Sequence, residues 1–419
     1  MQTSKSGPCY STAEQHTRER AYDDALAAVE REAKRAPRTL SSKLGRQQRI
    51  TASFAQFSAH ALDLRDEATQ ILTHDFLPVG TALARWARRF DPTLSMPDII
   101  QACRNAWTAC GLQPLLGERM QITPAILAYS LLYPYSDNYL DLEHESTAAK
   151  LRFSERFRDR LRGETLPPHN SREASVWTMI ELIEGQFPRR DFPHVFDCLL
   201  AIHRAQQESL AQVSTGNLYD DAELLRLSCA KGGASVHADA CLARGWLTAQ
   251  ETQFAFEWGV LLQLGDDLQD VREDLARGSV TLFSRSAVAG QSLDGLVTQL
   301  LNFADKVGAR MHHLPNGSAT LRDLLRMSWR SLIVGAVANS HEFFSPAFLK
   351  EAERSSPFRF AFLRARRERL TSRQGLYTTL FEAFLEGPDD SLGNLPSPEL
   401  YKALQVDADF EPVGGFSTL

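Results

Sequence analysis

The sequence predicts an all-α protein with one large helical domain. From about residue 50 to 345, apolar residues recur at spacings of three and four, as on the buried faces of helices. No Val/Ile/Thr-rich alternating segment indicates a strand. Segments rich in Pro and Gly, such as 91–98, 163–171 and 186–193, separate about eight to twelve helices, roughly the number in a large bundle.

The two ends of the chain differ from this central part. Residues 1–45 are polar, and their charged helical segment has no wide apolar stripe, so we expect a leader that is frayed or docked on the surface. Residues 46–345 form the predicted helical domain. Residues 346–419 contain two further helical stretches and then a loose tail rich in Pro, Gly, Ser and Asp.

Composition limits the classes of function. A net charge of −6 argues against nucleic-acid binding, which requires a basic surface. The six Cys are dispersed, without a C-x-x-C pair or His at zinc-finger spacing, so we interpret them as small buried side chains in a reducing compartment. No run of about 18 apolar residues indicates a transmembrane segment, and the first residues are polar. We therefore expect a cytoplasmic protein.

The most informative segment is residues 256–284. Asp266, Asp270 and Asp274 are spaced i, i+4, i+8 and share one face of a predicted helix, with Asp267 beside them. Stacked carboxylates repel one another unless a cation lies between them. A solvated acidic surface would give the same spacing, and this alternative stays open on the spacing alone.

The same helix face changes character towards its N-terminus. Before Asp266, on successive turns, this face carries Gln263, Gly259 and Phe256. The face is therefore acidic at one end and uncharged at the other. A uniformly solvated surface does not require this gradient. Clustered carboxylates are ligands that suit Mg²⁺, which also binds phosphate oxygens. The pattern therefore predicts an acidic mouth above an apolar cavity lined by the three uncharged residues.

These residues also carry a family resemblance. The run Gly259, Gln263, Asp266, Asp267, Asp270 resembles the second Asp-rich motif of trans-prenyl diphosphate synthases, G-x-x-x-Q-x-x-D-D-x-x-D. One register along, Asp270 and Asp274 followed by Arg-Gly are similar to the squalene/phytoene synthase signature. Both families belong to the class I isoprenoid synthases, so the resemblance implies a large helical bundle around a central apolar cavity.

A second acidic helix is expected opposite the first. Asp137 and Asp141 lie one turn apart in residues 123–146, and Tyr133 continues their face towards an apolar end that we expect to line the cavity. The run from Asp137 to Asp141 resembles the first Asp-rich motif, with Asn138 where chain-elongating enzymes usually carry Asp. The Arg-Arg pair that follows this motif in those enzymes is missing, which favours a reaction of a single substrate.

Basic residues for a diphosphate are also predicted. Lys231 precedes Gly232 and Gly233, which cost about 1 kcal/mol each in a helix and so indicate a helix break or a close backbone approach. This stretch is similar to that of bacterial large-terpene synthases of the tetraprenyl-β-curcumene type. Close packing beside a solvated lysine is an equal alternative. The second motif is flanked by three further candidates, each of which can equally be a surface ion-pair partner: Arg272, Arg277 and Arg285.

The resemblance implies a Mg²⁺-dependent class I terpene synthase acting on a prenyl diphosphate. Asp137, Asp141, Asp266 and Asp270 would be catalytic, and with Asp267 and Asp274 they would hold three Mg²⁺ ions around the diphosphate. The alternatives are a prenyltransferase, by chain elongation or squalene/phytoene-type coupling, and a non-catalytic helical interaction protein with a degenerate acidic site. A homodimer is compatible with the sequence.

Overall fold

The computed structural model describes residues 8–35, 39–140, 146–214, 219–385 and 395–401. All regular secondary structure in these ranges is helical, so the predicted all-α class is confirmed. None of the described helices is both long and apolar enough to cross a lipid bilayer.

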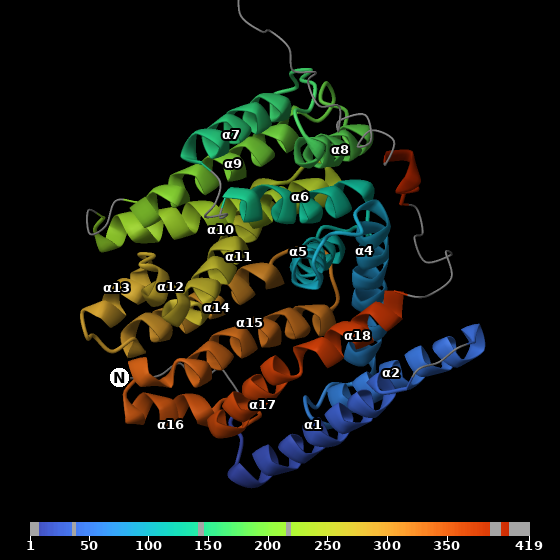
Figure 1. Cartoon of the computed structure of the whole chain (residues 1–419). Coiled ribbons are helices and arrows are strands. Elements are labelled where there is room, and N and C mark those ends of the chain that lie inside the picture. The colour runs from blue at the N-terminus through green and yellow to red at the C-terminus, as the bar shows by residue number, and fades with distance from the viewer. Residues whose placement is uncertain (1–7, 36–38, 141–145, 215–218, 386–394, 402–419) are drawn as a thin grey trace, which may run out of the picture.

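Three helices form the middle of the bundle: α5 (Met96–Leu115), α10 (Asp221–Arg244) and α11 (Ala249–Gln269) (Figure 1). Their ends follow local signals. Ser95 and Thr248 cap the N-termini of α5 and α11 with capping boxes, and α10 ends at Gly245, whose φ of 92° is costly for other residues.

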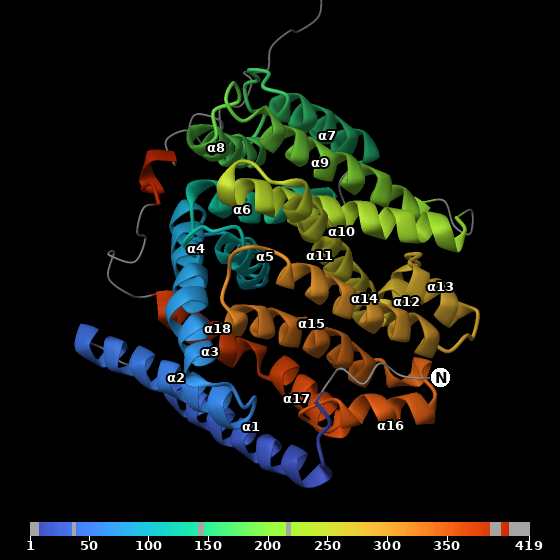
Figure 2. The same cartoon turned by 180° about the vertical axis from the view of Figure 1, so that it is seen from behind.

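The other helices surround these three on all sides (Figures 1 and 2). Before α5 the chain forms α1 (Thr12–Ala33), α2 (Leu40–His60), α3 (Asp66–Gln70), a π-helical turn (Ile71–Phe76) and α4 (Leu77–Phe90). Between α5 and α10 lie α6 (Pro124–Leu140), α7 (Thr147–Leu161), α8 (Ser171–Gln186) and α9 (Pro193–Ser214). After α11 come α12 (Val271–Arg277), α13 (Leu282–Val288), α14 (Asp294–His312), α15 (Ala319–Asn339), a 3₁₀ turn (His341–Phe343), α16 (Pro346–Arg354), α17 (Phe360–Ser372) and α18 (Gln374–Leu385).

Two large apolar clusters hold the bundle together. One is formed mainly by α4, α5, α6, α8 and α9, and the other by α11, α14 and α15. Helix α10 contributes to both, with Ala238 and Cys241 in the first and Val236 and Ala240 in the second. Helix α5 likewise contributes Cys110 to the first and Leu112 to the second. Burial of this apolar surface is the dominant favourable term in folding, so α5 and α10 join the two halves.

The two ends of the chain pack against each other. Helix α1 lies along α2 and α18, and α17 is close by (Figure 1). Three carboxylates of α1 form ion pairs with arginines in or beside α17: Glu19 with Arg359 (2.6 Å), Asp23 with Arg366 (2.6 Å) and Glu30 with Arg369 (2.8 Å). The charged face of the leader, which lacks an apolar stripe, is thus neutralised by the basic C-terminal extension.

Candidate functional site

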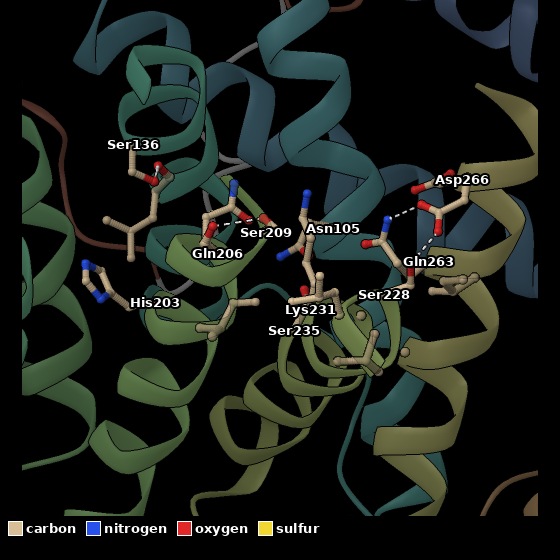
Figure 3. A pocket seen from close by; sticks show the side chains of 18 of the residues that line it. Asn105, Ser136, His203, Gln206, Ser209, Ser228, Lys231, Ser235, Gln263 and Asp266 are labelled. Atoms are coloured by element: carbon tan, nitrogen blue, oxygen red, sulfur yellow. Dashed lines mark hydrogen bonds between the residues drawn. The ribbon is translucent and has the colours of Figure 1, made fainter. Parts of the chain in front are cut away.

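A cavity of about 600 Å³ opens between α5, α6, α7, α9, α10 and α11. Its apolar lining comes from Leu132, Phe153, Phe157, Leu161, Leu199, Ile202, Leu227, Val236, Leu262, Val280 and Leu332. Figure 3 shows Asp266 and Gln263 at one side of this cavity, Ser136 and His203 at the other, and Lys231 and Asn105 between them. A polar, acidic region and an apolar region therefore share one cavity.

The acidic region is built at the end of α11. Asp266, Asp270 and Asp274 all line the cavity. The expected single helix is interrupted, because α11 ends at Gln269 and α12 begins at Val271. The amide of Asp270 nevertheless donates to the carbonyl of Asp266, and that of Asp274 to the carbonyl of Asp270, both at 2.8 Å. The helical spacing of the three carboxylates is retained across the break.

These carboxylates carry unfavourable negative charge. Burial in the cavity raises the pKa of Asp266 to about 6, against the opposing charge of Arg104 and with a smaller contribution from the carboxylates of Asp270 and Asp267. Burial, together with Asp267 and Asp270, raises the pKa of Asp274 to about 7. The pKa of Asp270 is also raised, mainly by burial and then by Glu273. Because each charge disfavours the next, a bound cation would stabilise the cluster.

Asp267 occupies a different environment from the other three. Its side chain is buried, its Oδ2 accepts a hydrogen bond from Ser228 Oγ at 2.7 Å, and its Oδ1 accepts one from Gln263 Nε2 at 2.8 Å. Both oxygens thus have protein donors on α10 and α11. The bond from Ser228 joins α11 to α10, and the role of Asp267 as a metal ligand stays a prediction.

Two basic residues line the cavity beside the carboxylates. Lys231 on α10 was predicted, and its charge lowers the pKa of both Asp266 and Asp267. Arg104 on α5 was not predicted, and one of its guanidinium nitrogens lies 3.5 Å from Asp266 Oδ1. More than half of the Arg104 side-chain surface, 55%, is still exposed. It can therefore also contact an anion in the cavity mouth.

The three arginines expected at the diphosphate are placed elsewhere among the described residues. Arg272 forms an ion pair with Glu342, and Arg285 donates to the carbonyl of Tyr219 and pairs with Asp221. Arg277 is exposed on α12, although its charge acts on Asp270 and Asp274. None of the three lines the cavity. The surface ion-pair interpretation therefore holds for Arg272 and Arg285.

The paired glycines mark a close approach of α10 and α11. Helix α10 continues without a break through Gly232 and Gly233. A Cβ built on Gly259 would lie 2.0 Å from the carbonyl oxygen of Gly232, and one built on Gly232 would lie 2.4 Å from that of Gly259. The helical glycines are thus explained by contact between backbones, which brings Lys231 towards the acidic end of α11.

The predicted cavity residues divide into three groups. Gly259 and Gln263 line the cavity, as expected. Phe256 does not, because its ring covers Gly233 and remains 39% exposed at the surface. The side chains of Tyr133 and Asp137, and the whole of Asp141, lie outside the described residues. Ser136, which precedes Asp137 on α6, does line the cavity.

A buried acid lies further into the cavity. Asp239 follows Lys231 by eight residues on α10, about 12 Å by helix rise. Its Oδ1 accepts a hydrogen bond from Asn105 Nδ2 at 3.2 Å, whereas its Oδ2 has no partner among the described residues. Burial raises the pKa of Asp239 well above its usual value, against the bond from Asn105. Asp239 is therefore a buried acid of the cavity lining whose charged form is disfavoured.

Comparison of the chain with protein-family models, with curated proteins and with solved structures gave no match. The geometry of the site comprises three carboxylates on successive turns, two basic side chains beside them, and a cavity whose lining mixes polar and apolar side chains.

Proposed function

We propose that this protein is a Mg²⁺-dependent class I terpene synthase that ionises a prenyl diphosphate and converts the allylic cation to a terpene. One observation carries the proposal: Asp266, Asp270 and Asp274 line one cavity together with Lys231, Arg104 and eleven apolar side chains. A prenyl diphosphate combines a multiply charged head, which the charged residues would bind, with a hydrocarbon tail, which the apolar side chains would contact.

The carboxylates of Asp266, Asp270 and Asp274, which we call the acidic wall, suit Mg²⁺ as ligands. Asp266, Asp270 and Asp274 offer carboxylate oxygens, which Mg²⁺ prefers. Their pKa values are raised mainly by burial and in addition by neighbouring carboxylates, and a divalent cation would offset both effects. We expect Asp137 and Asp141 to supply further carboxylate ligands, because residues 137–141 resemble the first Asp-rich motif. Bound Mg²⁺ supplies Lewis-acid stabilisation of the negative charge that develops on the leaving diphosphate.

The chain's own residues then have distinct roles. Lys231 and Arg104 contact diphosphate oxygens as fixed positive charges. Because the protein as a whole is negatively charged, an anionic substrate requires such local positive charges. Ser228 and Gln263 hold Asp267 and with it the relative position of α10 and α11. The apolar side chains exclude water, so that the cation rearranges and loses a proton before it can be quenched.

The direct test is incubation of the purified protein with C10 to C35 prenyl diphosphates and Mg²⁺, followed by mass spectrometry of organic extracts. We expect a hydrocarbon product from one prenyl diphosphate supplied alone. Lys231→Met, which keeps the length of the side chain without its charge, should reduce turnover.

Three outcomes would replace the proposal by its alternatives. Product formation only when two different prenyl substrates are supplied together would assign a chain-elongating prenyltransferase, and a hydrocarbon with twice the carbon number of a single substrate would assign squalene/phytoene-type coupling. Absence of both product and diphosphate release with every chain length would favour a non-catalytic helical protein. Lys350→Met, on the surface helix α16 and outside the cavity lining, serves as the matched control for loss of one lysine charge.

A further inference from the structure

A second cluster of ligand-type side chains lies between α9 and α10. The Sγ atoms of Cys198 on α9 and Cys241 on α10 are 3.0 Å apart, and Cys198 Sγ lies 3.8 Å from Nδ1 of His237. The three ligand atoms all lie within 4.8 Å of one another. None of these residues lines the cavity described above.

The cluster is held by rigid elements. His237 and Cys241 are one turn apart on α10, so their side chains share a face. Cys198 approaches from α9, which packs along α10. Cys198 and Cys241 are buried at 7% and 2% exposure, while His237 is half-buried. Two thiols thus face each other and an imidazole at the edge of the first apolar cluster, to which both cysteines belong.

We propose that Cys198, His237 and Cys241 form a zinc site. Thiolate and imidazole are the ligands that Zn²⁺ prefers, with Zn–S of about 2.3 Å and Zn–N of about 2.0–2.1 Å. In a tetrahedral site these bond lengths place the ligand atoms about 3.4–3.8 Å apart. The Sγ–Sγ separation of 3.0 Å is shorter than this range, and the Sγ–Nδ1 separation of 3.8 Å lies at its upper end. Small side-chain rotations would therefore bring the three atoms to the positions of zinc ligands.

The fourth ligand position falls to a water molecule or to His194. This histidine precedes Cys198 by one turn on α9, and its Nε2–H donates to the carbonyl of Gly245. The zinc would join α9 to α10, and α10 contributes to both apolar clusters. It would therefore stabilise the packing of these helices, independently of the Mg²⁺ chemistry proposed above.

The metal content of the protein purified under reducing conditions tests this site. We expect about one zinc per chain, retained in Cys103→Ala and lost in His237→Ala and Cys198→Ser. Cys103 is the matched control, because it is equally buried but lies on α5 and donates to the carbonyl of Gly80. Reduced, chelator-treated wild-type protein should also take up Co²⁺ and show the thiolate-to-cobalt absorption of a tetrahedral site.

Three results would overturn the proposal. The first is a Cys198–Cys241 disulfide, found by peptide mass spectrometry, in protein without zinc. The second is failure of the reduced wild-type protein to bind either Zn²⁺ or Co²⁺, a result that holds even if the variants do not fold. The third is zinc that remains unchanged in a folded His237→Ala variant.

Discussion

Replacing Gly259 with Ala should destabilise the protein, although alanine is the better helix former. The added Cβ would lie 2.0 Å from the carbonyl oxygen and 2.7 Å from the carbonyl carbon of Gly232. Both atoms belong to the backbone of α10, so no side chain can rotate away. The two helices must separate instead, at the contact that places Lys231 beside the acidic wall.

The magnitude follows from two opposing terms. Overpacking of a well-packed interior typically costs about 1–3 kcal/mol, and occasionally more. The gain in helix propensity from Gly to Ala is at most about 1 kcal/mol. Because the clash is with backbone, we expect the upper part of the range and a net loss of about 1–2 kcal/mol in the free energy of unfolding.

Urea unfolding followed by circular dichroism measures this loss. Gly335→Ala is the matched control, since Gly335 lies inside α15 and a Cβ there meets no atom within 4 Å. The control should keep or raise the unfolding midpoint, whereas Gly259→Ala should lower it. If both variants gained stability equally, the contact between α10 and α11 would be wrongly described. Turnover should also fall in Gly259→Ala and not in Gly335→Ala.

Three further predictions concern the cavity. Asp270→Ala should reduce diphosphate release by on the order of a hundredfold or more. The circular dichroism spectrum should stay unchanged and the melting temperature should stay the same or rise, because the carboxylate repels its neighbours. Unchanged turnover would contradict the role of Asp270. Mg²⁺ and diphosphate together should raise the melting temperature more than either alone, and equal stabilisation by diphosphate without Mg²⁺ would count against a metal cluster. Asp239→Asn should become more stable than wild type as pH rises above about 4, by up to about 1.4 kcal/mol per pH unit. The reason is that the pKa of the buried acid is raised, so wild-type folding must take up a proton that the unfolded chain has lost. Urea unfolding of both proteins at pH 5, 6 and 7 measures the difference in stability, and a difference that stays constant with pH would refute the prediction.

The helical fold was predictable because its signals are local. Periodicity of apolar residues defines the helices, and breaks such as 163–171 and 186–193 fall where α7 meets α8 and α8 meets α9. The packing of α1 against the C-terminal extension was not predictable, because it joins residues more than 300 positions apart through paired charges. A polar sequence alone does not reveal where its partner lies.

The acidic wall was found from spacing, whereas its basic partners were only partly found. Proximity in sequence suggested Arg272 and Arg285, but helix rotation directs both to other ion pairs. Arg104 was missed, although a signal exists: Gln101, Arg104, Asn105 and Thr108 form a polar stripe at helical spacing on α5, whose buried residues are mainly apolar. Such a stripe on a buried helix indicates a cavity lining.

The Cys-His-Cys cluster was missed because only C-x-x-C and zinc-finger spacings were considered. His237 and Cys241 are spaced i, i+4, which places two ligands on one face of a helix, as in other helical metal sites. Their partner Cys198 lies 39 residues before His237 and becomes a neighbour only when α9 folds along α10. Sequence spacing can therefore supply a pair of ligands, while the third requires the tertiary structure.

The central claim is that the acidic wall and the apolar cavity together ionise a prenyl diphosphate with the help of Mg²⁺. Its most direct test is the rate of diphosphate release by wild type and Asp270→Ala, each with Mg²⁺ and with chelator, from the prenyl diphosphate of the C10 to C35 series that the wild type converts fastest. We predict release only by the wild type with Mg²⁺, apart from a small residual rate in the variant. Release that is equal with and without Mg²⁺, or equal in both proteins, would contradict the account.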